Sequence, residues 1–142
     1  MSKEIMIKIA NIQVSKEADT EEMEFVTEAK LYRRNGAIYL LYEESEFSGM
    51  PGCKTRLRLR DDELQMKRFL EDGEIGTELI FQKGKKHEEL YETPFGPIEI
   101  ELLTNDIAHD ISEDGKGEID IDYEISLRGL AESRNRMHIT LM

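Results

Sequence analysis

Cysteine and long apolar runs are scarce in this sequence of 142 residues. The single cysteine, Cys53, cannot form an internal disulfide, and one free thiol is typical of a reducing compartment, so we expect a cytoplasmic protein. No stretch approaches the roughly 18 apolar residues that a membrane-spanning helix needs. The first residues, Met1 to Glu4, do not resemble a signal peptide. We therefore expect no membrane partner.

Basic residues are also in the minority. The chain has 19 Lys and Arg against 31 Asp and Glu, which gives a formal net charge of −12 at pH 7. Proteins that bind nucleic acid need cations to neutralise the phosphates, so this excess of acid predicts no nucleic-acid partner. Hydrophobic residues nevertheless make up 39% of the chain and recur in regular patterns, which indicates a folded protein. The length fits one domain over residues 1–142.

Apolar residues recur at every second position along several segments. Over residues 117–127 five of them alternate with acidic or polar residues, namely Ile119, Ile121, Tyr123, Ile125 and Leu127. The same alternation occurs over residues 53–59 and 98–102. Because only a β-strand places successive side chains on opposite faces, these segments are predicted strands with one apolar face.

Turn residues separate the alternating segments. Asn35-Gly36 joins two of them, and Asn-Gly readily takes the positive φ angles of a two-residue type I′ hairpin. Residues 61–71 fit a helical face loosely and are interpreted as a turn or a strand. Further turns are predicted at residues 48–52, 72–73, 83–86, 93–96 and 113–117. The predicted strands are 5–14, 23–34, 37–45, 53–60, 63–70, 77–82, 87–92, 97–104, 107–111, 117–127 and 134–141.

Many short antiparallel strands with one apolar face form either a sandwich or a barrel. Closure removes the unpaired edges that long alternating strands would otherwise expose, so a barrel is favoured. The predicted fold class is therefore all-β, a single closed or nearly closed antiparallel β-barrel.

The second half of the chain carries a specific order of short motifs. They are Phe81-Gln-Lys-Gly84-Lys-Lys, Tyr91-Glu-Thr93-Pro94-Phe95-Gly96, Tyr123-Glu-Ile-Ser-Leu-Arg-Gly129 and Ser133-Arg-Asn135. In order and spacing, the sequence resembles the YwiB-like family of small bacterial proteins of unknown function. The resemblance implies a calycin-type barrel, related in architecture to lipocalins. It brings no agreed activity, so it supplies no catalytic residues.

Motifs for phosphate, calcium and nucleotide binding are incomplete. Ser48 and Cys53 stand where a Walker phosphate-binding loop needs its two glycines. The segment that begins at Asp110 matches the start of a calcium loop, but Ile121 occupies the position of the bidentate glutamate. A dinucleotide fingerprint would need a third glycine at Asp120. We therefore expect no metal site and no cofactor.

Catalysis is the least favoured class of function. Cys53 follows a Pro-Gly turn on an apolar strand face, where a lone cysteine is usually a packed side chain. The three histidines, His87, His109 and His138, show no paired spacing. No set of nucleophile, base and orienting group can be assembled from the sequence, and we name no catalytic residue.

Four basic side chains project from one face of one predicted strand, a row that we call the basic ladder: Lys54, Arg56, Arg58 and Arg60. Residues 54–68 hold six basic and three acidic residues, whereas residues 99–124 hold ten acidic residues and one lysine. In the favoured interpretation, the ladder faces solvent and pairs with carboxylates of neighbouring strands. In the alternative, it lines an anion site or docks against an acidic strand of a second copy.

A second candidate site lies where Thr93 to Gly96 joins two alternating strands. Such a connection lies at a barrel end, where ligands of these folds enter. The groups near it suit an anionic or amphipathic small molecule: Tyr91, Thr93, Phe95, Arg134, Asn135 and Arg136. In the plainer interpretation, Pro94 and Gly96 only shape a turn, and Tyr91 packs in the core.

Two function classes remain open. In the first, the protein is a non-enzymatic barrel that binds a small anionic or amphipathic molecule. In the second, it is a protein-interaction or homodimerising module with a filled barrel. A densely packed inner face favours the second class, and would be made by Phe25, Leu31, Tyr39, Leu57, Phe81 and Tyr123. Polar side chains in an open end, such as Arg58 or Tyr91, favour the first.

Overall fold

The computed structural model describes residues 2–15, 20–43, 53–69, 75–93, 96–127 and 132–142. In these residues the chain forms ten β-strands and no helix. The strands are β1 (Ser2–Ser15), β2 (Glu21–Arg34), β3 (Ala37–Glu43), β4 (Lys54–Arg60), β5 (Glu63–Phe69), β6 (Ile75–Gln82), β7 (Lys86–Thr93), β8 (Gly96–Ile111), β9 (Gly117–Leu127) and β10 (Glu132–Leu141). The all-β prediction is confirmed.

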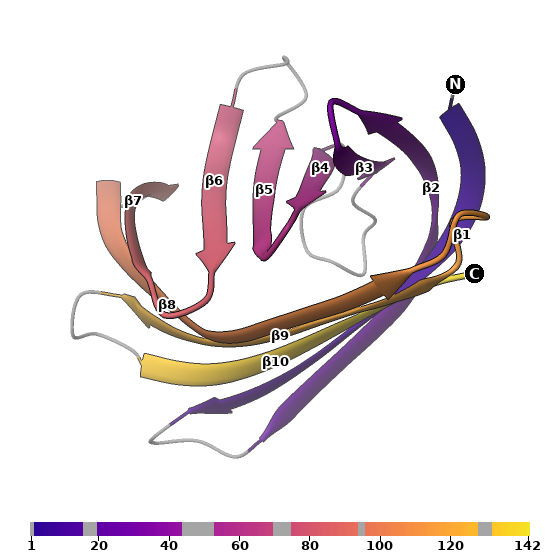
Figure 1. The fold of residues 1–142 in the computed structure, drawn as a ribbon. Coiled ribbons are helices and arrows are strands. Elements are labelled where there is room, and N and C mark those ends of the chain that lie inside the picture. The colour runs from indigo at the N-terminus through magenta and orange to yellow at the C-terminus, as the bar shows by residue number, and fades with distance from the viewer. Residues whose placement is uncertain (1, 16–19, 44–52, 70–74, 94–95, 128–131) are drawn as a thin grey trace.

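The strands form one antiparallel sheet in the order β6-β5-β4-β3-β2-β1-β10-β9-β8-β7. Neighbours in the sheet are mostly neighbours in the sequence, and the pairing of β1 with β10 joins the two halves. Figure 1 shows the sheet curling so that β4, β5 and β6 stand over β8, β9 and β10. The sheet thus forms a nearly closed barrel, as the alternating pattern predicts.

The barrel stays open along one seam, between its terminal strands β6 and β7. Among the described residues these strands form no ladder of paired backbone groups. The turn between them is instead held to β8, because the Gly84 amide donates to the Thr104 carbonyl at 2.8 Å and the Thr104 amide donates to the Lys85 carbonyl at 3.3 Å. Farther along the seam, His87 Nε2 lies 3.4 Å from the Glu78 carbonyl oxygen.

Two local predictions have clear outcomes. Asn35 and Gly36 have φ angles of 52° and 79°, and Arg34 pairs with Ala37, which confirms the two-residue hairpin. The separate strands predicted for 97–104 and 107–111 are wrong, because both belong to β8. The register shifts between Thr104 and Asp106, so one extra residue in the strand breaks the alternation without ending the strand.

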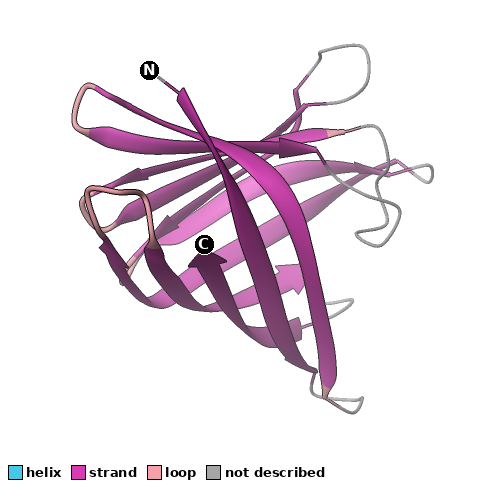
Figure 2. Cartoon of the chain, turned by 90° about the vertical axis from the view of Figure 1, so that its right-hand side faces the viewer, coloured by secondary structure: helices cyan, strands magenta, loops and turns pink. Residues whose placement is uncertain are grey.

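The described turns gather at one end of the barrel, which we call the closed end: residues 35–36, 61–62, 83–85 and 112–116. Figure 2 shows these short turns side by side. The opposite end, which we call the open end, is where β1, β3, β5, β7 and β9 finish. The turns predicted at residues 48–52 and 72–73 lie outside the described residues, as do residues 94–95 of the 93–96 turn.

The turn that resembles a calcium loop is tied down by the protein's own cations. Arg33 donates to the carbonyl oxygens of Ser112 and Glu113 at 2.8 and 3.1 Å, and Lys3 donates to that of Asp114 at 2.6 Å. The Asp114 carboxylate accepts hydrogen bonds from the Ser112 hydroxyl and the Lys116 amide, which lower its pKa. The carbonyl oxygens of this turn at the closed end therefore have hydrogen-bond donors from the protein itself.

The barrel interior is packed most densely near the closed end. Its fully buried side chains are mainly aliphatic: Ile7, Leu40, Leu57, Leu64, Leu102, Ile119, Ile121 and Ile139, together with Phe81. Along β5 the inward positions change from Leu64, which is 0% exposed, through half-buried Met66 to Arg68 near the open end. The interior therefore changes from an apolar plug to a mixed lining along the barrel axis.

Candidate functional site

A cavity of about 210 Å³ lies inside the barrel, between the apolar plug and the open end. Seven strands contribute its lining: Ile9, Asn11, Met23, Phe25, Tyr42, Met66, Arg68, Leu79, Tyr123 and Met137. Most of these side chains are apolar, three of them are flexible methionines, and none is acidic. An apolar cavity with a few polar groups is the usual form of a small-molecule site.

Asn11 supplies one polar group of the cavity. Its Nδ2 donates to Oδ1 of Asn135 at 3.4 Å, and Nδ2 of Asn135 donates to the Ser133 hydroxyl at 3.0 Å. Asn135 is 4% exposed, so this chain of amides is well inside the barrel. The Oδ1 atom of Asn11 is buried and has no hydrogen-bond partner among the described residues. This oxygen is an acceptor, so it is available to a hydrogen-bond donor of a bound molecule.

Arg68 supplies the positive charge of the cavity. It lies one residue before the end of β5 and pairs with Thr55, whose side chain is fully buried inside the barrel. Its Nε atom is also shielded from solvent. A guanidinium is a cation that offers only hydrogen-bond donors, so Arg68 brings donor groups to a lining that is otherwise mostly apolar.

Tyr123 of the cavity lining packs against Phe81 of the plug. Tyr123 lies edge-on to Phe81, with ring centroids 5.0 Å apart and an interplanar angle of 72°. Burial raises the pKa of the Tyr123 hydroxyl to about 12. The phenol is therefore neutral at physiological pH and adds no negative charge to the lining.

The structure separates the residues predicted around the Thr93–Gly96 connection. Asn135 faces the interior, whereas Arg134 and Arg136, on either side of it, face outward and are exposed. Arg134 is held on the outer face by Asp122 through two hydrogen bonds of 3.2 and 2.9 Å. Phe95 and the side chains of Tyr91 and Thr93 lie outside the described residues.

The basic ladder lies on the outer face of β4. Lys54 and Arg60 are exposed, while Arg56 and Arg58 are half-buried against their neighbours. Arg58 lies 3.8 Å from Glu63, the one ladder contact with a carboxylate among the described residues. The Arg56 guanidinium instead packs 5.8 Å from the ring centroids of both Tyr39 and Phe69. Tyr39 therefore faces outward, and its predicted place on the packed inner face of the barrel is wrong.

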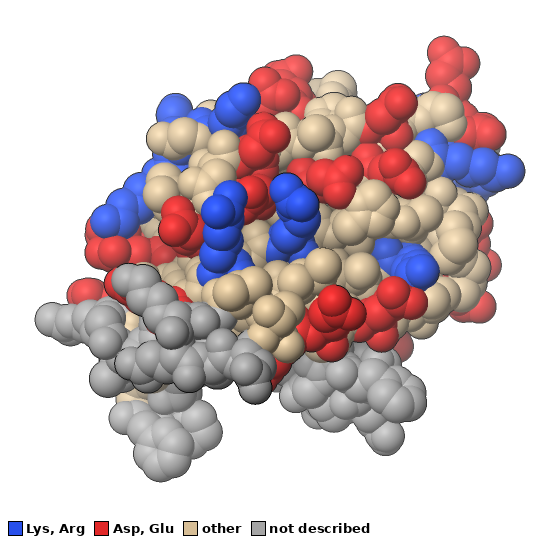
Figure 3. Space-filling view, turned by 90° about the horizontal axis from the view of Figure 1, so that it is seen from below, with Lys and Arg blue, Asp and Glu red and all other residues tan. Residues whose placement is uncertain are grey.

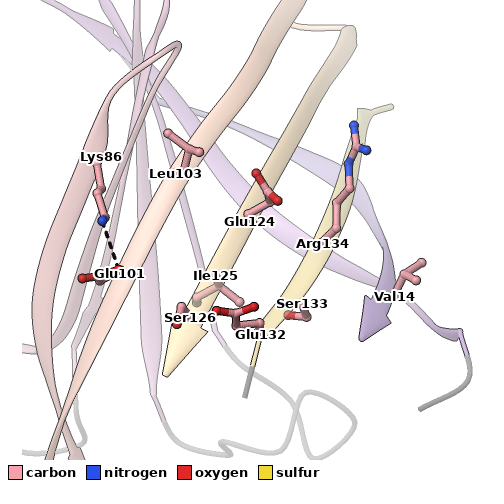
Figure 4. A pocket seen from close by; sticks show the side chains of 10 residues that line it. All are labelled: Val14, Lys86, Glu101, Leu103, Glu124, Ile125, Ser126, Glu132, Ser133 and Arg134. Carbon is pink, nitrogen blue, oxygen red and sulfur yellow. Dashed lines mark ion pairs between the residues drawn. The ribbon is translucent and has the colours of Figure 1, made fainter. Parts of the chain in front are cut away.

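A larger groove of about 420 Å³ lies on the outer side of β8, β9 and β10 near the open end. Figure 4 shows Lys86 facing Glu101 there, at 3.1 Å, with Glu124 and Glu132 on the neighbouring strands. Figure 3, which views the barrel from below, shows acidic and basic groups interspersed over the surface. The groove lies on the outer surface, and its two basic side chains are already paired, Lys86 with Glu101 and Arg134 with Asp122. The interior cavity is therefore the better candidate site.

Comparison with known proteins gives a family and a fold. A family model described as a domain of unknown function, DUF1934, matches residues 7–139. The chain belongs to the DUF1934 family. Its fold is similar to the crystal structure of the ywiB protein from Bacillus subtilis, with a TM-score of 0.81 and 23% sequence identity over 99% of this chain and 91% of that one. No protein with a curated function matches significantly.

These findings confirm the resemblance to the YwiB-like family, whereas the calycin relationship stays a prediction. DUF1934 membership supplies no ligand and no activity, so the function of this chain must be argued from its own cavity. Among the described residues, no three His, Cys, Asp or Glu side chains converge as metal ligands would. No helix in the described part is long and apolar enough to cross a bilayer.

Sequence reasoning about this DUF1934 chain missed the two polar residues that line the cavity. The signal for Arg68 was available, because it shares the parity of Leu64 and Met66 and so belongs to the inner face of their strand. The signal for Asn11 was weaker. It follows Ile5, Ile7 and Ile9 in alternation, but nothing local shows that the interior is hollow at its level.

Proposed function

We propose that this protein binds a small anionic or amphipathic molecule inside its barrel and performs no catalysis on it. The observation that carries the proposal is the cavity of about 210 Å³, whose apolar walls include two polar side chains, Asn11 and Arg68. A protein core packed to normal density would leave no such space. The cytoplasmic location expected from the lone Cys53 thiol is part of this proposal.

The size of the cavity limits the ligand. Pockets for drug-sized molecules measure about 300–1,000 Å³, so a space of about 210 Å³ suits a smaller one. It equals the volume of about seven water molecules at about 30 Å³ each. The methionines in the lining, Met23, Met66 and Met137, can adjust to ligands of different shape because their side chains are flexible and polarisable.

A cavity-filling variant tests this function. Leu79→Phe places a larger ring in the cavity, whereas Leu103→Phe makes the same change on the outer face of β8. We expect small amphipathic molecules of six to eight carbons to raise the melting temperature of the wild type and of Leu103→Phe. Leu79→Phe should lose this response. The proposal fails if no such molecule stabilises the wild type, or if Leu79→Phe responds as strongly.

One observation favours an additional role as a homodimer. Tyr32 and Tyr39 stack on the outer face with centroids 4.8 Å apart and an interplanar angle of 2°, and Arg56 packs against the second ring. Tyrosine and arginine are enriched at protein interfaces, and a second copy would bring acidic strands to the ladder. Sedimentation at low and high salt tests this role. A monomer at both salt concentrations would exclude it.

A further inference from the structure

We propose that the cavity binds a neutral molecule with a hydroxyl group, a small alcohol, and that this hydroxyl donates a hydrogen bond to Oδ1 of Asn11. The inference rests on the proposed binding function and chooses, among amphipathic ligands, those with a neutral donor. Three features of the described residues support it: the direction of the Asn11 amide, the methionines beside it, and the charge of the cavity lining.

The Asn11 amide has a fixed direction. Its Nδ2 donates to Oδ1 of Asn135 at 3.4 Å, and Nδ2 of Asn135 donates in turn to the Ser133 hydroxyl at 3.0 Å. Because the nitrogen and the oxygen of an amide point to opposite sides of its carbon, this contact turns Oδ1 of Asn11 away from Asn135. Asn11 lines the cavity, whereas Asn135 is not among the described residues that do. The oxygen, and not the nitrogen, is therefore left for a ligand.

Oδ1 of Asn11 lacks a donor. The atom is shielded from solvent, and no described residue donates a hydrogen bond to it. An amide oxygen that loses its water on burial without gaining a donor destabilises the folded protein. A ligand with an O–H group removes this cost, whereas an ether or a hydrocarbon of the same shape does not. The oxygen therefore favours donors over molecules that only accept hydrogen bonds.

Two methionines can give a ligand access to this oxygen. Met137 on β10 and Met23 on β2 are the cross-strand neighbours of Asn11 on its two sides, and both line the cavity. A methionine side chain is unbranched and has three rotatable bonds, so it can move aside while the backbone stays in place. A hydroxyl group can therefore reach Oδ1 of Asn11 although the atom is shielded from solvent.

The charge of the lining selects among possible head groups. The described lining holds one cation, Arg68, and no acidic residue. An ammonium group could donate to Asn11, but it would lie beside Arg68 without a counter-ion, which is costly away from water. A carboxylate brings no hydrogen to the Asn11 oxygen. A hydroxyl group donates to Asn11, and its own oxygen can accept from a guanidinium N–H in addition to the interaction that Arg68 has within the protein.

Two isomeric ligands test the inference. 1-Hexanol and methyl pentyl ether have the same composition and both accept hydrogen bonds, but only the alcohol donates one. Their binding is measured by isothermal titration calorimetry with the wild type, Asn11→Leu and Met137→Leu. Asn11→Leu removes the acceptor. Met137→Leu is the matched control, because it changes the neighbouring side chain of the lining and retains Asn11.

The expected result is a preference for the alcohol that depends on Asn11. The wild type and Met137→Leu should bind 1-hexanol about three to ten times more tightly than the ether, the effect of one neutral hydrogen bond. Asn11→Leu should bind the two isomers equally. Hexanoate, titrated in the same way, should bind the wild type less tightly than 1-hexanol.

The outcomes separate the inference from the binding function on which it rests. Equal binding of the two isomers by the wild type overturns the inference but leaves the binding function standing. Binding of none of the three ligands overturns both. A preference for the alcohol that persists in Asn11→Leu overturns the assignment to Asn11, and tighter binding of hexanoate than of 1-hexanol overturns the choice of a neutral ligand.

NMR of the wild type replaces the variant if Asn11→Leu does not fold. A hydrogen bond accepted by an amide oxygen also polarises the nitrogen of the same amide. The nitrogen-15 signal of the Asn11 side chain should therefore move further with 1-hexanol than with methyl pentyl ether. Equal movement with the two isomers, or movement with neither, overturns the inference.

Discussion

Arg134 and Asp122 form a two-pronged ion pair on the outer face of the barrel. Nε and Nη2 of the arginine donate to the two carboxylate oxygens at 3.2 and 2.9 Å. The Asp122 side chain is 16% exposed, whereas Arg134 is 65% exposed. The hydrogen bonds from Arg134 hold the pKa of Asp122 below its usual value of 3.8. This pair links β9 to β10 and commits Arg134 to a structural contact.

The pH dependence of stability should reveal this ion pair. Because the pKa of Asp122 is lower in the folded protein, the pair stabilises the fold above the unfolded value of 3.8 and loses its effect as pH falls through the folded value. We expect Arg134→Gln to lower the free energy of unfolding only modestly at pH 6, because the arginine is exposed. The difference from the wild type should shrink as the pH falls below 3.8 and the Asp122 carboxylate of the folded protein becomes protonated. Urea denaturation over a series of pH values from 6 downward measures it, and a difference that does not change with pH would contradict the assignment.

Gly117 should tolerate substitution less well than Gly84. A Cβ atom at Gly117 would lie 2.1 Å from the Asp110 carbonyl oxygen and 2.7 Å from the Cα of Ile111, and neither backbone atom can move aside easily. At Gly84, nothing lies within 4 Å and only the φ angle of 75° opposes a side chain. We expect Gly84→Ala to cost about 1–2 kcal/mol and Gly117→Ala more than about 3 kcal/mol. Chemical denaturation of both variants tests the order, and the reverse order would show that the β8–β9 connection adapts.

The plug and the cavity wall should respond differently to truncation. Leu64 is fully buried, while Met66, two residues further along the same strand, lines the cavity. Leu64→Ala creates a new hole in a packed region and should cost about 3–5 kcal/mol. Met66→Ala enlarges an existing space and should cost about 2 kcal/mol or less. Equal losses of unfolding free energy would mean that the region around Met66 is as densely packed as the plug.

Divalent metals should leave the stability of the protein unchanged. Binding of a metal to the folded state alone would raise the melting temperature in proportion to its affinity. The calcium-like turn already binds Lys3 and Arg33 through its carbonyl oxygens. We expect no shift in melting temperature with micromolar zinc, calcium or magnesium. A shift of several degrees would identify a metal site, and Asp110→Asn and Asp114→Asn would then test its location.

Much of the fold follows from local pattern. Alternation indicated the strands and their apolar faces, and Asn35-Gly36 indicated the two-residue hairpin between β2 and β3. The irregularity in β8 could not be found this way, because an extra residue at Asn105 reverses the alternation in the same manner as a turn would. The partners of each strand were also beyond local reasoning, since β1 pairs with β10 across nearly the whole chain.

The sequence by itself determined which side of each strand is apolar, because side-chain direction in a strand depends only on parity. That information places Arg68 on the inner face of β5 and the basic ladder on the outer face of β4. Tertiary structure decided where the interior is filled and where it is hollow. Whether space remains depends on the combined volume of the side chains that seven strands bring to one level of the barrel. No single segment of the sequence shows that combined volume. Tertiary structure also decided that Asn135 faces inward beside Asn11 while Arg134 binds Asp122 outside, because these contacts join residues more than ten positions apart.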